Sequence, residues 1–233
     1  MGNIINFIVI IVGSLIGLII GHKFKDNLKN IIMDCSGLFV IIIGIKNSLN
    51  SDRDIIVLIY LIVGSIIGQL IDIDLRLEHF SQFLEKKFNS LNGNENNKKT
   101  EKNFAKGFSV ATILFCAGAM AIVGAINSGL TGDDTTLNIK SVLDGTMAII
   151  LTSIYGIGVL FSSISVFLYQ GFFYIFANQI KVFLTEQAIS DINFLGGIMV
   201  MAIGINILFK KEIKIANMLP TLFIPIIIGI FSK

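Results

Sequence analysis

Long apolar runs are the feature that most limits how this chain can fold. Residues 4–20, 55–71 and 194–209 carry mostly aliphatic, aromatic and small side chains. A helix needs about 20 such residues to cross the roughly 30 Å hydrocarbon core of a bilayer. Only 15% of the residues are charged, against about 25% in a typical soluble domain, so the apolar residues cannot all enter one core. The sequence therefore predicts an all-α integral membrane protein.

The apolar runs predict seven or eight transmembrane helices. The expected spans cover residues 4–20, 31–49, 55–71, 107–126, 142–161, 164–183, 194–209 and 215–231. The last run is short for a span and contains Pro220 and Pro225. Each proline removes a backbone donor, so we expect this segment to be kinked or partly re-entrant. The first run lacks a basic n-region and a small-residue cleavage site, which favours a span over a signal peptide.

A charged segment divides the spans into two groups. Hydrophobic residues recur at spacings of three and four from Ile73 to Leu91, with charges between them, which predicts an amphipathic helix at the membrane surface. Residues 92–103 contain no apolar side chain and are typical of a flexible linker. We therefore expect an N-terminal membrane half (1–72), a cytoplasmic segment (73–104) and a C-terminal membrane half (105–233).

The distribution of lysine and arginine predicts the orientation. With eight spans, the loops after the odd-numbered spans carry 13 of these residues and the other side carries 5. Cytoplasmic loops are enriched in Lys and Arg. We therefore expect a multi-pass membrane protein with its N-terminus outside and the amphipathic helix in the cytoplasm.

Small residues predict close helix packing. Gly13, Gly17 and Gly21 recur every four residues in the first span, a pattern that lets another helix approach closely. Packing within the chain is favoured over homodimerisation through these glycines, although a thin bundle of 233 residues is compatible with a homo-oligomer. Cys35 and Cys116 each lie inside an apolar run, and free thiols are favoured over a disulfide.

Two short segments resemble each other. SGLFVIIIGI at 36–45 aligns with GGIMVMAIGI at 196–205. Under the expected topology they cross the membrane in opposite directions, so spans 1–3 and 6–8 would form an inverted repeat. Inverted repeats recur in secondary transporters. Chance similarity between two low-complexity runs is the alternative.

Polar side chains gather at the edges of the later spans and inside them. Such groups are costly at membrane depth and usually line a cavity or a path. One carboxylate with several neutral oxygens suits a hard cation such as Na⁺, or a coupled proton, and the identity of the ion stays open. The candidate ion- or solute-binding residues are Asp144, Asn127, Ser128, Gln170 and Asn206, with Asp34, Lys140 and Asp133 as further candidates.

A purely structural role for Asp144 is the competing interpretation. It follows Lys140 by four residues, so on a helix the two charges share a face and neutralise each other.

Enzyme signatures are absent from the sequence. It contains no P-loop, GxSxG, HExxH or CxxC motif, and His22 and His79 fall at predicted membrane surfaces. The basic residues lie in loops between spans instead of forming one patch. We therefore expect no enzymatic activity, no cofactor and no nucleic-acid partner, only the lipid bilayer and a small ion or solute.

Several motifs together resemble a known family. They are GNIIN at the start, FCAGAMAIVGAINSGLTGD at 115–133, KSVLDG at 140–145, GIGVLFS, YQG at 169–171, GGIMVMAIGINIL and KIANMLP. The chain is similar over essentially its whole length to the bacterial DUF554 family. The resemblance implies a polytopic inner-membrane protein with a transport role and no defined substrate.

Two functions from different classes are consistent with the sequence. The first is a small-ion or small-solute transporter or channel with a polar site inside the membrane. The second is a membrane scaffold or regulator that does not transport, whose amphipathic helix and linker recruit a cytoplasmic partner.

Overall fold

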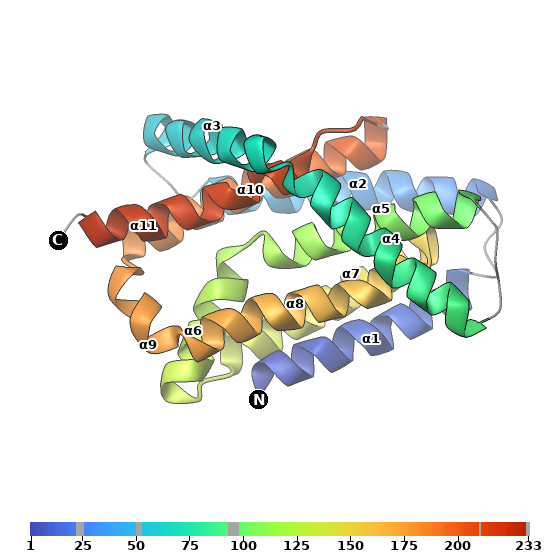
Figure 1. Ribbon diagram of the computed structural model, residues 1–233, viewed down its shortest axis with the longest axis horizontal. Coiled ribbons are helices and arrows are strands. Elements are labelled where there is room, and N and C mark those ends of the chain that lie inside the picture. Colours follow the sequence, from blue (N-terminus) through green and yellow to red (C-terminus); the bar gives the residue numbers. More distant parts are fainter. Residues whose placement is uncertain (22–25, 50–52, 93–97, 210, 232–233) are drawn as a thin grey trace.

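The fold is that of a computed structural model, which describes residues 1–21, 26–49, 53–92, 98–209 and 211–231. Every element within these ranges is a helix, and most of them run roughly along the longest axis of the molecule (Figure 1). In chain order the helices are α1 (Gly2–Gly21), α2 (Asp26–Ser48), α3 (Asp54–Ile71), α4 (Ile73–Asn92), α5 (Lys98–Cys116), α6 (Ala119–Thr131), α7 (Thr135–Tyr155), α8 (Gly158–Ile175), α9 (Ala177–Ile180), the 3₁₀ helix η1 (Lys181–Phe183), α10 (Glu186–Phe209), the 3₁₀ helix η2 (Ile215–Phe223) and α11 (Ile224–Phe231).

The predicted all-α membrane class is confirmed. Among the described residues, α1, α2, α3, α7, α8 and α10 are each long and apolar enough to cross a membrane. The bent pair of α5 and α6 is either a broken seventh span or a re-entrant loop. The run over η2 and α11 is a shorter apolar segment. Its first part is a 3₁₀ helix that contains Pro220, as expected for a segment in which proline interrupts α-helical hydrogen bonding.

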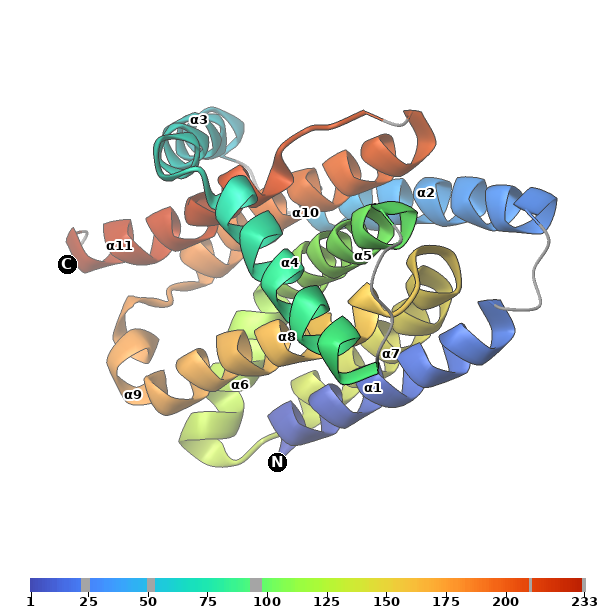
Figure 2. The ribbon, with the colours of Figure 1, turned by 45° about the vertical axis from the view of Figure 1, so that its right-hand side comes forward.

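The helices that are candidate membrane spans point in alternating directions along the chain (Figure 1). The start of α1, the turn between α6 and α7, α9 and the end of α11 lie in the left-hand half of the molecule in both ribbon views (Figures 1 and 2). The end of α1, the start of α2 and the end of α10 lie at the right-hand end. The helix bundle therefore has two opposite ends, and we call the one that holds the start of α1 the N-terminal end.

Glycines bring α1 against α7. A Cβ atom at Gly13 would lie 2.5 Å from the carbonyl oxygen of Gly145, and one at Gly17 would lie 2.5 Å from that of Ile149. Gly21 likewise approaches the backbone of Ser153. The glycine stripe of the first span is thus used for packing inside the chain, where small residues allow two backbones to come close.

The two similar segments of α2 and α10 pack against each other. A Cβ at Gly44 would lie 2.6 Å from the carbonyl oxygen of Gly197, and one at Gly204 would lie 2.7 Å from that of Gly37. The glycines that align in sequence are thus the ones at which these antiparallel helices touch. The contact explains why both segments need glycine at these positions, while the duplication itself stays a prediction.

The predicted fourth span is wrong as a continuous helix. The segments Phe104–Cys116 and Ala119–Thr131 meet at an angle of 62°. Between them Gly118 has an extended backbone, with φ −158° and ψ 147°, which ends the helix. The carbonyl oxygen of Ala117 contacts Gly196 of α10 closely, so the break is part of a packed helix crossing.

The boundaries predicted for the next three spans are also wrong. α7 begins at Thr135, earlier than expected, and its last residue is Tyr155. Gly156 follows it with a φ of +81°, which a residue with a side chain rarely adopts. α8 therefore covers residues 158–175, and α9 and η1 follow it as separate short elements. α10 begins at Glu186. These shifts place Lys140 inside α7.

The charged middle segment is helical on both sides of residues 93–97, which lie outside the described residues. The amphipathic prediction for 73–91 corresponds to α4, and the Phe80 ring of this helix lies 5.9 Å from the Phe108 ring of α5. α5 begins at Lys98, so the second part of the expected linker is helical. Cys35 and Cys116 are free thiols, as expected.

The glycine contact between α1 and α7 predicts a specific sensitivity. We expect Gly17→Ala to lower the free energy of unfolding by about 1–3 kcal/mol, because the added methyl group would overpack a closed helix contact. Val12→Leu adds one carbon on the exposed side of the same helix, where Val12 is 48% exposed, and should leave stability unchanged. Unfolding of both variants in detergent micelles checks this prediction, and equal effects would contradict the packing argument.

Candidate functional site

The centre of the candidate site is a buried ion pair on α7. The ammonium Nζ of Lys140 lies 2.5 Å from Oδ2 of Asp144, and both side chains are 8% exposed. The four-residue spacing places the two groups one above the other on the same helix face. The expected pairing is therefore present, and it lies in the interior of the bundle.

Two side-chain amides from other helices complete the network. Nδ2 of Asn6 on α1 donates to Oδ2 of Asp144 at 3.0 Å and to Oε1 of Gln170 on α8 at 3.3 Å. Asn6 and Gln170 are both fully buried. One turn earlier on α1, Asn3 donates to the carbonyl oxygen of Phe167 at 3.2 Å. We call Asn6, Lys140, Asp144 and Gln170 the polar network.

Close helix packing makes this network possible. Gly145, next to Asp144, contacts Val9 of α1 closely, and Gly13 reaches the backbone of Gly145. This contact draws the first turns of α1 against α7, so the short side chain of Asn6 reaches the carboxylate. A bulkier residue at either glycine would hold the amide away from Asp144.

Several polar atoms at the network have no hydrogen-bond partner among the described residues. They are Oδ1 of Asn3, Oδ1 of Asn6, Nε2 of Gln170 and the hydroxyl of Tyr169. The amide of Asn6 must turn its N–H groups to the carboxylate, so its oxygen is the atom left over. A buried polar atom without a partner costs about 1–3 kcal/mol, which makes these atoms candidates for contact with water or a ligand.

The break between α5 and α6 lies beside the network. Cys116, the last residue of α5, is within electrostatic range of Lys140, Asp144 and Tyr169. No heavy atom lies within 4 Å of the place that a Cβ would occupy at Gly118, so there is open space at the break. The first N–H groups of α6 have no partner inside their own helix, and they begin at this point.

The network lies inside the N-terminal end of the bundle. Asn6 is four residues from the start of α1, and Gln170 is five residues from the end of α8, so both lie about 6–8 Å inside their helix ends. Asp144 is nine residues from the start of α7, or about 13 Å. The network therefore lies inside three of the helices that are long and apolar enough to cross a membrane.

Two other predicted site residues belong to the turn between α6 and α7. Ser128 donates to Oδ1 of Asp134 at 2.5 Å, and Oδ2 of Asp134 lies 3.3 Å from the N-terminal ammonium. Asp133 is exposed and accepts the backbone N–H of Thr135 at 2.9 Å, which caps the start of α7. Ser128 and Asp133 thus stabilise a turn at the surface, outside the polar network.

The remaining sequence candidates also lie apart from the network. Asn206 exchanges two hydrogen bonds with the backbone of Ile213, at 2.9 and 3.0 Å, and closes the connection after α10. Asp34 is exposed on α2, and Asn127 is half-buried on α6. Of the eight candidates, the structure brings together Asp144, Lys140 and Gln170.

Sequence reasoning missed Asn3 and Asn6. The signal was present, because the two asparagines are three residues apart and therefore share a face of an otherwise apolar helix. They lie on the same side as Gly13 and Gly17, which marks the packed face of α1. Among the residues that the structure describes, no three His, Cys, Asp or Glu side chains converge as a metal site.

Comparison with known proteins agrees with the resemblance seen in the sequence. The family described as "Protein of unknown function (DUF554)" matches residues 1–230. The "Uncharacterized membrane protein YdfK" of Bacillus subtilis (strain 168) is 34% identical over 228 residues, which cover 96% of this chain and 93% of that protein. The "Uncharacterized protein YqgA" of Escherichia coli (strain K12) is 26% identical over 224 residues, or 96% and 94% of the two chains. No solved structure matches the chain.

The turn at Asp134 predicts a pH dependence of stability. The Ser128 hydroxyl, followed by the backbone N–H of Gly2, holds the pKa of Asp134 below its ordinary value of 3.8. A lowered folded-state pKa gives stability that is present above the unfolded pKa and is lost as the pH falls through the folded one. Asp134→Asn mimics the protonated carboxyl. We therefore expect this variant to be less stable than the wild type at pH 7 and equally stable at about pH 2.

Thermal unfolding at the two pH values measures the effect, and only the difference between the two proteins is interpreted. Asp34→Asn, which removes a charge from an exposed position on α2, is the control. A difference between the wild type and Asp134→Asn that persists unchanged at low pH would contradict the assignment.

Proposed function

This chain belongs to the DUF554 family, and we propose that it is a transporter of a small ion or solute whose binding site is the polar network. The observation that carries the proposal is the buried Lys140–Asp144 pair, joined to Asn6 and Gln170 from two other helices. Ionisable side chains inside a membrane bundle are costly and usually mark substrate or proton pathways.

The cost of the network argues against a purely structural role. A buried ion pair is often no more stabilising than apolar residues of similar volume, because both charges lose their hydration. Here the cost is increased by unpartnered polar atoms on Asn6 and Gln170. Packing alone does not require such an arrangement, whereas binding of a polar ligand does.

Further polar atoms that have no hydrogen-bond partner within the described ranges extend the network along the bundle. They belong to Ser14 on α1, Thr112 on α5, and Thr152 and Tyr155 on α7, and all four residues are buried. Thr152 lies eight residues beyond Asp144 on the same helix, or about 12 Å further from the N-terminal end. Polar atoms without protein partners at successive depths support a hydrated path through the interior, since backbone and side-chain polar groups inside a membrane need partners.

The broken helix supports the same proposal. Discontinuous helices near the bilayer centre supply free backbone groups to the sites of many transporters. The break at Ala117–Gly118 lies beside the ion pair and has open space next to it. A ligand at the network would therefore also reach the free N–H groups at the start of α6.

The geometry suggests how binding would be coupled to movement. Lys140 holds the place on Asp144 that an incoming proton or cation would take. Oxygen atoms of Asn6 and Asn3 are available as neutral ligands. Protonation of Asp144, or a hard cation bound to it, would release Lys140 and change the contact between α7 and α1.

Charge substitutions distinguish transport from a structural pair. We expect Asp144→Asn to fold and to lose ion flux, and Lys140→Met/Asp144→Asn to remain inactive. If the pair were only structural, the single variant would be unstable and the double variant would recover, because an unpaired buried charge costs more than a missing pair. Potential-driven proton uptake and radioactive sodium uptake into proteoliposomes measure function, and thermal unfolding measures stability.

A neutral variant tests the network beyond the pair. Asn6→Leu should reduce flux while the ion pair remains. Asn206→Ala, which alters an amide outside the network, should leave flux intact if the protein folds. Full flux in a stable Asp144→Asn protein would remove the carboxylate from the mechanism.

The proposal includes the orientation expected from the positive residues, with the N-terminal end outside the plasma membrane. Thr131, the last residue of α6, and Lys211, which follows α10, are both exposed. The end of α6 and the end of α10 lie at opposite ends of the bundle (Figure 1). In a chain carrying Cys35→Ser, we expect Thr131→Cys to react with an impermeant thiol reagent in intact cells. Lys211→Cys should react only after lysis, and the reverse pattern would invert the topology.

A further inference from the structure

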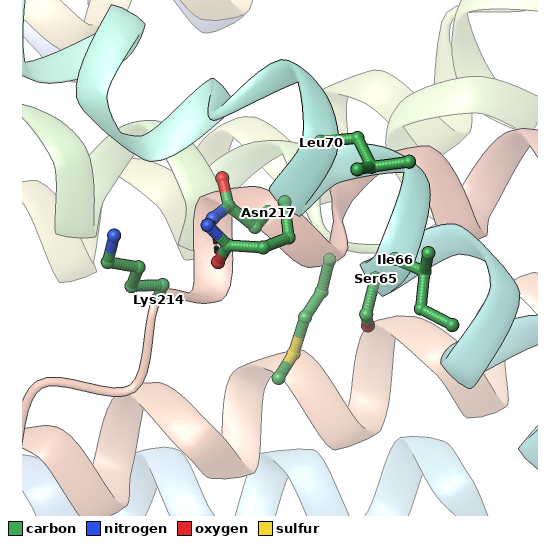
Figure 3. A pocket seen from close by; sticks show the side chains of 7 residues that line it. Ser65, Ile66, Leu70, Lys214 and Asn217 are labelled. Carbon is green, nitrogen blue, oxygen red and sulfur yellow. Dashed lines mark hydrogen bonds between the residues drawn. The ribbon is translucent and has the colours of Figure 1, made fainter.

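A groove of about 400 Å³ lies on the outer surface between α3 and η2, and none of its lining residues belongs to the polar network. Its apolar part consists of Ile66, Leu70 and Met218, and its polar part of Gln69, Lys214 and Asn217. Figure 3 shows Lys214 and Asn217 on one side of the groove and Ile66 on the other. We call this the α3–η2 groove. Its composition is that of a site for an amphipathic molecule.

Close backbone contact positions the groove. Gly68 of α3 touches the backbone of Asn217, and a Cβ at Gly64 would lie 2.6 Å from Cα of Thr221. The two elements therefore meet along one narrow line. Side chains beside that line stay open to the surroundings, since Ile66 is 54% and Leu70 is 82% exposed. In a membrane those surroundings are lipid.

The polar part of the groove lies where α3 ends and η2 begins. α3 ends at Ile71, where Asp72 adopts a left-handed backbone with φ 52°, and η2 begins immediately after Lys214. The end of α3 and the start of η2 therefore both lie beside the polar part of the groove. From there the apolar part of the groove continues along α3, past Leu70 to Ile66.

The charges of Lys214 and Asp72, beside the polar part of the groove, are only loosely paired. Nζ of Lys214 lies 3.8 Å from Oδ1 of Asp72, and their side chains are 53% and 35% exposed. This separation is too long for a hydrogen bond, and Oδ1 of Asp72 has no hydrogen-bond partner in the described structure. Asp72 is not one of the lining residues, but its side chain is 35% exposed beside Lys214, so one anion lies next to the cation of the groove.

The amides at the polar end provide one further donor. Asn217 is fixed, because its Nδ2 donates to Oε1 of Gln69 at 2.9 Å and its Oδ1 accepts the backbone N–H of Asp74 at 2.7 Å. These bonds orient the Gln69 side chain and leave its Nε2 as the donor of that amide. Lys214 and Gln69 can therefore share one group that carries several acceptor oxygens, as a phosphate does.

We propose that the α3–η2 groove binds a phospholipid whose headgroup carries both a phosphate and a primary ammonium, as phosphatidylethanolamine does. Lys214 and Gln69 bind the phosphate oxygens, Asp72 binds the ammonium, and one acyl chain lies along Ile66, Leu70 and Met218. The proposal does not depend on the transport function.

The local charge favours this headgroup over a purely anionic one. Asp74 lies within electrostatic range of Lys214, Glu78 and Asp72. Arg76 is a second cation nearby, because its Nε donates to the carbonyl oxygen of Ile71 at 3.0 Å. The three carboxylates therefore still outnumber the two cations, Lys214 and Arg76. A headgroup with net negative charge would be repelled by the carboxylates, whereas a zwitterion can satisfy both signs.

Lipid retention by the purified full chain tests the proposal. The protein in detergent is incubated with equal amounts of phosphatidylethanolamine and phosphatidylglycerol that have the same acyl chains, and bound lipid is counted by native mass spectrometry. We expect phosphatidylethanolamine to be retained preferentially. Lys214→Gln and Asp72→Asn should each weaken its retention about tenfold, since each removes one charged contact.

Two further variants keep the test decisive. Lys211→Gln removes a positive charge from an exposed residue outside the groove and should bind as the wild type does. Leu70→Gln changes a side chain that is 82% exposed, so it should fold normally and weaken binding of long-chain lipid more than of a short-chain analogue. Equal or better retention of phosphatidylglycerol, or the same loss with Lys211→Gln, would overturn the proposal.

Discussion

The hydrogen bond from Asn6 to Asp144 depends on how closely α1 approaches α7, and much of the interior depends on that bond. It joins the first span to a carboxylate in the second half of the chain and links both to Gln170 on α8. Both charges of the buried Lys140–Asp144 pair lose most of their hydration, so the amide of Asn6 supplies a polar contact that water would otherwise make. The same groups form the candidate transport site, and stability and function therefore meet in one place.

Glycine contacts solve the general problem of packing helices in lipid. Apolar side chains gain little by leaving lipid for another apolar surface, so association depends on close van der Waals packing. α1 meets α7 at Gly13 and Gly17, and α2 meets α10 at Gly44. At Gly68 the close contact of α3 with η2 leaves a groove open to lipid. The packing that closes the interior thus also shapes the outer surface.

The site shows where sequence reasoning succeeded and where it stopped. Asp144 and Lys140 were recognisable because two charges four residues apart stand out in an apolar run. Asn206 looked equally suitable, but it bonds to the backbone of a following turn, which residue type does not reveal. Asn6 was overlooked although it shares a helix face with Asn3, because the sequence does not indicate its partner 138 residues away.

The sequence by itself determined the membrane class, the family and the glycine faces, because these follow from local composition, periodicity and shared motifs. It did not determine the break at Gly118, where the helix ends although the hydrophobic run continues. Nor did it determine which polar side chains meet, because α1 packs against α7 and α8, and α2 against α10. Those pairings depend on which backbones can touch, and only the tertiary structure decides which unpaired polar groups then face one another.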